Sequence, residues 1–317
     1  MNFIPCKTII ENMSRVIIGK HKSMELLLTA LIADGHVLLE DVPGVGKTLI
    51  AKSLSKSIGG TFKRIQFTPD LLPTDVTGFN VYNQKTERFT YQPGPVITNI
   101  LLADEINRAI PRTQAGLLES MEERQITIDG DAITLPAPFF VMATQNPIEL
   151  EGTFPLPEAQ LDRFLLKINL GYPDKDEEIS IMKRFQKDDP LMALSPVSTP
   201  QQIVDMQQSR KHIHVSSSVH EYIADIVGAT RRCVGLKFGA SPRGAIGLMR
   251  SAQALAALRG REYVLPDDVK YLVYAVLAHR LIPDAKERLR GKTAADFLEE
   301  ILDRAPAPIP AGNRFKA

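Results

Sequence analysis

The sequence predicts an α/β fold built on a parallel sheet, followed by an all-helical domain. In the first half, short apolar runs typical of buried strands alternate with segments of helical periodicity, as in a parallel sheet with crossover helices. After Gly171-Tyr172-Pro173 the composition shifts, and the remaining patterns are almost all helical. We therefore expect an α/β domain over residues 1–173, a helical domain over 174–304, and a flexible tail over 305–317 that cannot bury enough apolar surface to order itself.

The elements of the first domain follow one another in a regular order. The expected strands lie at residues 37–40, 64–67, 100–105, 139–143 and 164–170. The expected helices lie at 24–33, 48–58 and 111–123, the last opened by a proline at its first position. Two hairpins are expected, one pairing 79–82 with 88–91 and one over 125–135 with an Asp-Gly turn.

The second domain is predicted from its helical patterns. A charged amphipathic helix is expected over residues 174–185, and the strongest later patterns cover 220–230, 243–258 and 266–279. Pro242 and Pro266 stand where a helix can begin, because the missing proline N–H would have no partner there.

A glycine-rich turn after the first strand, VPGVGKT, has the composition of a polyphosphate-binding loop. Gly44 and Gly46 can adopt backbone angles closed to other residues, so that successive N–H groups converge on phosphate oxygens. Lys47 can then reach the β and γ phosphates, and Thr48 offers a hydroxyl to Mg²⁺. The strict pattern has a glycine where this chain has Asp41, which is a departure from it.

An apolar strand with the sequence ILLADE ends in two adjacent carboxylates, Asp104 and Glu105. Mg²⁺ needs a carboxylate within reach of the threonine hydroxyl, and hydrolysis needs a base that polarises water. We expect Asp104 to serve the metal and Glu105 the water. The alternative, a solvated strand end, is disfavoured by the glycine turn upstream.

Three further polar residues are candidates for the same chemistry. Asn146 follows the strand at 139–143 and is expected beside Glu105, holding water or the γ phosphate; capping of the next helix is the alternative. Arg163 is expected at the end of a short helix in the segment PLPEAQLDRF, where a surface pair with Asp162 or Glu158 is the alternative. Arg243 lies in the first turn of a helix, where its charge opposes the helix dipole unless an anion is near.

Composition excludes several classes of protein. The chain has 317 residues, 44% of them hydrophobic, and its 38 Lys and Arg against 37 Asp and Glu give a net charge of +1. This balance shows no electrostatic footprint for nucleic acid or an anionic membrane. Cys6 and Cys233 lack the spacing of a zinc site or disulfide framework. Neither a signal-peptide core nor an apolar run of about 18 to 20 residues is present, so we expect a cytoplasmic protein without membrane insertion.

The segments DVPGVGKT, LLADEINRA, ATQNPIELEGTFPLPEAQLDRF and SPRG, in this order, resemble the AAA+ ATPases and specifically the MoxR family. The resemblance covers the chain up to the tail and implies a P-loop NTPase core followed by a helical lid. It implies that Asn146 is sensor 1, that Arg163 is an arginine finger donated to a neighbouring subunit, and that Arg243 is sensor 2. The two hairpins match the insertions that this family shares with magnesium-chelatase motors and replicative helicases.

The resemblance also implies ATP and Mg²⁺ as cofactors. In the segment VIIGK, Ile17, Ile18 and Gly19 fall where the family cradles adenine. The aspartate at position 41 is compatible with the family pattern. Thr48 and Asp104 are the implied metal ligands, and the implied phosphate contacts come from the turn: Pro43, Gly44, Val45, Gly46, Lys47, Thr48 and Leu49.

The family forms rings, usually hexamers, and acts as a chaperone-like factor beside proteins with von Willebrand factor A domains, so the resemblance implies such partners and an unidentified client. A metal-chelatase motor working with a catalytic subunit remains open. A nucleic-acid motor is less favoured, because the hairpin at 125–135 has no Lys or Arg from Ile126 onward. Ile126 and Ile128 on this hairpin are expected to contact a partner protein, with simple hairpin packing as the alternative.

Overall fold

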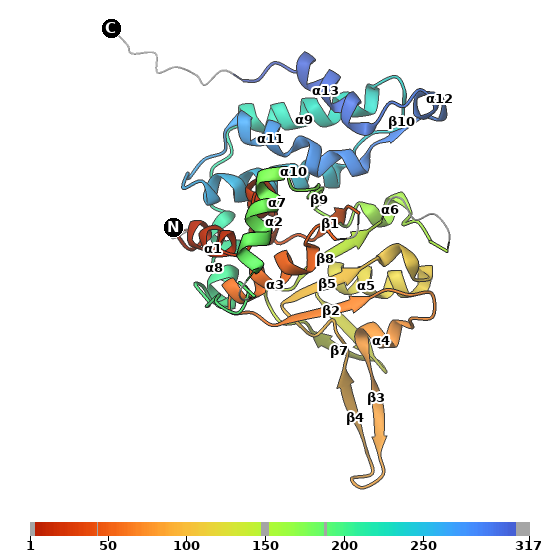
Figure 1. Cartoon of the computed structure of the whole chain (residues 1–317). Coiled ribbons are helices and arrows are strands. Elements are labelled where there is room, and N and C mark those ends of the chain that lie inside the picture. The colour runs from red at the N-terminus through yellow and green to blue at the C-terminus, as the bar shows by residue number, and fades with distance from the viewer. Residues whose placement is uncertain (1–3, 43, 147–151, 187–188, 309–317) are drawn as a thin grey trace. The chain divides into compact units, whose positions relative to one another are not determined.

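The computed structural model describes residues 4–42, 44–146, 152–186 and 189–308 (Figure 1). The chain divides into two compact units, one ending at Gln208 and one beginning at Ser209. The first unit contains the sheet and the second is mainly helical, as the sequence predicts.

Five parallel strands form the central sheet, in the spatial order β2-β5-β8-β1-β9. Their bounds are β1 Val37–Glu40, β2 Phe62–Gln66, β5 Ile100–Asp104, β8 Phe140–Gln145 and β9 Leu166–Ile168. The inner strands β5, β8 and β1 are buried along nearly their whole length, as expected for a sheet covered on both faces. Since all strands run the same way, the residues after β1, β5 and β8 meet at one edge, the carboxyl edge.

The helices of the first unit connect and cover these strands. Their bounds are α1 Ile4–Ser14, α2 His21–Ile32, α3 Lys47–Ser57, α4 Pro73–Thr77, η1 Ile106–Arg108, α5 Pro111–Glu123, α6 Glu158–Leu161, α7 Lys175–Phe185 and α8 Pro200–Arg210. The helix predicted after the glycine turn is α3, and the helix opened by Pro111 has the predicted bounds.

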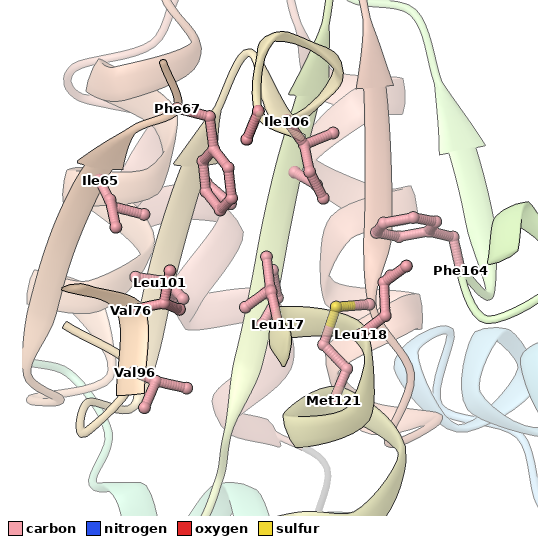
Figure 2. Packing of buried hydrophobic residues seen from close by; sticks show 14 of the residues in the cluster. Ile65, Phe67, Val76, Val96, Leu101, Ile106, Leu117, Leu118, Met121 and Phe164 are labelled. Atoms are coloured by element: carbon pink, nitrogen blue, oxygen red, sulfur yellow. The ribbon is translucent and has the colours of Figure 1, made fainter. Parts of the chain in front are cut away.

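A hydrophobic cluster fills the space between the sheet and α5, as Figure 2 shows. Leu117, Leu118 and Met121 point from α5 toward Phe164 and the strands, and each is at most 2% exposed. Burying such side chains contributes about 1.5–3 kcal/mol each. This packing fixes α5, and with it the short η1 turn that follows the carboxylates at the end of β5.

Two hairpins extend the first unit: β3 Gly78–Asn83 with β4 Arg88–Pro93, and β6 Gln125–Ile128 with β7 Asp131–Thr134. The second turns at Asp129 and Gly130, whose φ values of 51° and 94° suit a type I′ turn. Its Ile126 is 4% exposed, and Ile128 packs on the same hydrophobic cluster. The structure therefore supports hairpin packing for these isoleucines and corrects the expectation that they contact a partner.

Helices α7 and α8 belong largely to the first unit, although they were predicted as part of the second domain. Asn12 on α1 donates to Ser57 Oγ and to the Ser195 carbonyl, both at 3.0 Å. Gln207 Nε2 donates to the Leu31 carbonyl on α2 at 2.8 Å. Because these contacts tie residues 174–208 to the α/β core, the compact units divide 35 residues after the predicted boundary at 173.

The second unit packs four longer helices: α9 Ser217–Arg232, α10 Pro242–Leu258, α11 Pro266–Leu277 and α13 Ala294–Arg304. Smaller elements are β10 Leu236–Phe238, η2 Ala278–Arg280, β11 Ile282–Pro283 and α12 Ala285–Leu289. Leu248, Val273 and Phe297 are among its side chains exposed by 1% or less. No helix in the described parts of the chain is long and apolar enough to cross a membrane.

Candidate active site

The glycine turn is shaped to accept an anion. Gly44 and Gly46 have φ values of 89° and 88°, which L side chains rarely adopt. A Cβ atom built on either glycine would meet no atom within 4 Å, so the space above the turn is open. Helix α3 begins at Lys47, directly after Gly46, and points its N–H groups into this space. Pro43 lies outside the described residues.

Lys47 connects the turn to the sheet. Its Nζ donates to the Asp41 carbonyl at 2.8 Å. Burial lowers the pKa of Lys47 below its ordinary value of 10.5, and the charges of Asp104, Asp41 and Glu105 partly offset this effect. The carboxylates predicted from the sequence therefore lie close enough to act on the lysine electrostatically.

Asp104 ends β5 and is held on both carboxylate oxygens. Thr144 Oγ1 on β8 donates to Oδ1 at 2.6 Å. Arg64 on β2 donates to Oδ2 through Nε at 3.1 Å and Nη2 at 2.6 Å. These bonds fix the carboxylate at the carboxyl edge of the sheet, with 14% of its side chain exposed.

Glu105 has a left-handed backbone, with φ 55° and ψ 50°. A non-glycine residue in this region stores about 1–3 kcal/mol and needs neighbours to hold it there. Thr144 does so by accepting the Glu105 N–H at 2.8 Å. At the side chain, Oε2 accepts from Gln66 Nε2 at 2.7 Å and from Arg108 Nη1 at 3.1 Å.

Four of these supporting residues were not predicted from the sequence: Arg64, Gln66, Arg108 and Thr144. A signal for two of them exists in β2, where Arg64 and Gln66 are exposed and alternate with the buried Ile65. Two polar residues on one face of a strand indicate that they could hydrogen-bond to carboxylates on a neighbouring strand. Only the sheet order, however, shows that β2 and β5 are neighbours.

The residues predicted for Mg²⁺ supply the oxygen donors that a nucleotide-bound metal needs. Thr48 lies in the first turn of α3, next to Lys47, whose pKa is lowered by burial and partly restored by the charge of Asp104. Within the described residues, no three His, Cys, Asp or Glu side chains are grouped so that they could hold a metal ion alone. One hydroxyl and one carboxylate suit Mg²⁺, which takes its remaining ligands from phosphates and water.

An apolar pocket of about 250 Å³ opens beside the glycine turn, wholly within the first unit. Ile17 and Ile18 line it, as do Val45 and Leu49 of the turn and its helix. The pocket is also lined by three residues that were not predicted: Pro173, Ile181 and Phe185. Gly19 has φ 75°, and a Cβ there would lie 1.7 Å from Glu177, so this glycine permits a close approach to α7.

The three polar candidates occupy different places. Asn146 follows β8 at the same edge as Glu105. Arg163 precedes β9 at the opposite, amino edge, because Leu165 N donates to the His36 carbonyl just before β1. Its Nε pairs with Glu122 of α5 at 3.0 Å, an acid that the sequence reasoning did not consider. Arg243 lies in the second unit, in the first turn of α10.

Comparison with known proteins decides the family. Residues 36–166 match the ATPase family associated with various cellular activities, and residues 228–301 match the AAA lid domain. The chaperone MoxR1 of Mycobacterium tuberculosis is 47% identical over 277 residues, covering 84% of this chain and 73% of that protein. This chain belongs to the MoxR family of AAA+ ATPases.

Two other similarities agree with this family. The Bacillus subtilis protein YeaC, itself uncharacterised, is 50% identical over 300 residues, covering 95% of this chain and 94% of its own length. The crystal structure of a candidate ATPase from Cytophaga hutchinsonii matches with a TM-score of 0.91 at 38% identity, covering 97% of this chain and 96% of that one. The predicted α/β core, helical lid and ATPase activity are thereby confirmed for this MoxR-family protein.

Proposed function

We propose that this MoxR-family ATPase hydrolyses Mg²⁺-ATP at the glycine turn, works as a ring of identical subunits, and remodels or matures a client protein beside a von Willebrand factor A-domain partner. Lys47 begins the helix after β1, and Asp104 and Glu105 lie at the end of the parallel strand β5. This placement at one sheet edge carries the chemical part of the proposal. The name of the Mycobacterium relative, chaperone MoxR1, supports the chaperone-like part.

In the proposed reaction, Lys47 leaves the Asp41 carbonyl and compensates charge on the β and γ phosphates. Thr48 and Asp104 would hold Mg²⁺, which when bound supplies further neutralisation of the triphosphate. Glu105 orients the attacking water, and its bonds to Gln66 and Arg108 limit where the carboxylate can point.

Arg163 is proposed to act on the site of a neighbouring subunit. Its own glycine turn follows β1, whereas Arg163 precedes β9 at the opposite end of the paired strands. The four residues of β1 span three steps of about 3.3 Å each, so its two ends lie roughly 10 Å apart. This placement supports a role in trans, where an arginine finger stabilises transition-state charge. Asn146 and Arg243 are proposed to sense the γ phosphate, from the core and from the lid.

The β3–β4 hairpin supports a protein as the client. Phe89 is 70% exposed, Tyr82 50% and Phe79 48%, and the Tyr82 and Phe89 rings lie 5.3 Å apart. In Figure 1 this hairpin projects from the body of the first unit. Residues 78–93 contain only two basic side chains and one acidic side chain, too little charge to favour a phosphate backbone.

The test is retention of purified von Willebrand factor A-domain protein by the Glu105→Gln variant, which we expect to bind ATP without turnover. Retention should be strong with ATP and weak without nucleotide, because a ligand shifts an equilibrium only through different affinities for its states. Lys47→Ala should bind neither nucleotide nor partner.

Phe89→Ser should weaken retention of the von Willebrand factor A-domain protein and leave basal hydrolysis unchanged, while Lys85→Ser in the same hairpin serves as the matched control. Equal retention with ATP, with ADP and without nucleotide would refute the switching idea. If a catalytic partner subunit stimulated ATP hydrolysis only in the presence of a metal substrate, a chelatase motor would be favoured. Tight, salt-sensitive binding to single-stranded DNA would favour a nucleic-acid motor.

A further inference from the structure

Asp41 stands where a strict phosphate-binding turn has glycine, and the structure shows what its side chain does. The residue is 8% exposed. Its Oδ2 accepts from the Leu170 N–H at 2.5 Å and its Oδ1 from the Gly171 N–H at 3.0 Å. Its own carbonyl accepts from Lys47. One residue therefore contacts both the phosphate-binding lysine and the chain that leaves β9.

A carboxylate beside a polyphosphate site needs an explanation, because it repels the ligand. A buried charge is tolerated when hydrogen bonds satisfy it, and bonds from backbone N–H groups to a carboxylate are among the stronger ones. Here two successive amides bind the two oxygens, so the negative charge is directed toward the end of β9. The carboxylate thus acts as a link between two backbone segments.

The segment that Asp41 holds leads directly to residues that line the apolar pocket. Residues 169–174 connect β9 to α7, and Pro173, Ile181 and Phe185 line the same pocket as Ile17. The same connection is held from the other side by Lys20, whose Nζ donates to the Tyr172 carbonyl at 3.0 Å. All of these residues belong to the first unit.

We propose that Asp41 is a positioning residue that fastens α7 to the phosphate turn, so that the base-facing wall and the phosphate-binding turn form one ligand site. This inference rests on the proposed nucleotide site. Without the carboxylate, phosphates still bind the turn, but α7 no longer closes on the base. Asp41 would then contribute to affinity through the base half of the nucleotide.

The experiment is hydrogen exchange of the full chain with and without saturating Mg²⁺-ADP, followed on peptides from α3 and α7, together with ADP affinity by calorimetry. In the parent, ADP should protect both helices. In Asp41→Gly, which restores the strict motif, α3 should stay protected while α7 loses its ligand-dependent protection, and the Kd for ADP should rise about tenfold. A turn that needed only local backbone geometry would accept glycine without loss.

Asp41→Asn keeps the shape of the side chain and one acceptor oxygen. If Asp41→Gly unfolds, this variant tests the positioning role instead. We expect a several-fold rise in Kd with the same selective loss of protection in α7. Parallel changes in α3 and α7, or no change in either, would overturn the proposal. If ADP still protects α3 in Lys47→Ala, the proposed nucleotide site itself is wrong. If Lys47→Ala loses this protection while the Asp41 variants behave like the parent, only the proposed role of Asp41 is refuted.

Discussion

Replacing Thr144 by valine removes one hydroxyl that holds both carboxylate residues of the site. Thr144 is fully buried, donates to Asp104 at 2.6 Å and accepts the Glu105 N–H at 2.8 Å. Valine has nearly the same shape, so the packing of β8 between β5 and β1 is preserved. The substitution therefore isolates the two hydrogen bonds.

The magnitude follows from what the substitution leaves behind. An unsatisfied buried N–H at Glu105 costs about 1–3 kcal/mol, and a lost hydrogen bond to a charged carboxylate costs roughly 1.5–3 kcal/mol. We expect the free energy of unfolding to fall by about 3 kcal/mol. The strained backbone of Glu105 also loses its anchor, and a displacement near 1 Å of a catalytic group can cost on the order of 10²-fold in rate.

The assay compares kcat, ADP affinity and the urea midpoint in Thr144→Val and Thr144→Ser. Serine keeps the hydroxyl and loses only a buried methyl group, worth about 1 kcal/mol. We expect kcat to fall about 100-fold in the valine variant and to stay near the parent value in the serine variant, with ADP affinity similar in both. A valine variant with parental kcat, or equal losses of kcat in both variants, would refute the positioning role.

Two further predictions concern residues at the amino edge of the sheet. Arg163→Ala should lower hydrolysis by roughly 10³-fold or more and leave ADP affinity unchanged; mixing it with Lys47→Ala should restore part of the activity, and failure in rings shown to exchange subunits would indicate action within one chain. Burial lowers the pKa of His36 well below 6.5, and the charge of Arg124 adds to this effect. The stability that the neutral imidazole contributes is therefore present above pH 6.5 and lost as pH falls below it. Urea unfolding at pH 7.5 and 5 should show a larger acid loss in the parent than in His36→Gln, and equal losses would contradict the assignment.

Elements specified by local chemistry were predicted closely. Pro111 places the start of α5, and the Asp129-Gly130 turn places the second hairpin, because each depends only on nearby residues. The division between the two units after Gln208 differs from the boundary predicted at residue 173. It depends on contacts such as that between Asn12 and the Ser195 carbonyl, which lie 183 residues apart in the chain.

Within the site, the types of the chemical groups could be predicted, but not the groups that support them. Local strand and turn patterns, each contained in a single segment, predict the positions of Lys47, Asp104 and Glu105. Gln66 and Thr144 act across neighbouring strands, and the sheet order β2-β5-β8 that joins them cannot be obtained from local periodicity. The apolar pocket wall on α7 was missed for the same reason, since Phe185 meets the glycine turn only after the chain has passed through β9.

The direction of the parallel sheet explains why the charges of the site are divided. The acids, the lysine and the threonine all lie at or just after strand ends, so one edge collects the groups proposed to bind and hydrolyse nucleotide. Arg163 precedes a strand, and its pairing with Glu122 keeps it at the other edge. A single chain therefore presents the proposed nucleotide site at one edge and the proposed arginine finger, paired with Glu122, at the other. If subunits associate so that unlike edges meet, each interface gains both halves, and hydrolysis becomes dependent on assembly. The mixing experiment with Arg163→Ala and Lys47→Ala tests this dependence directly, because only interfaces that join an intact turn to an intact arginine can turn over ATP.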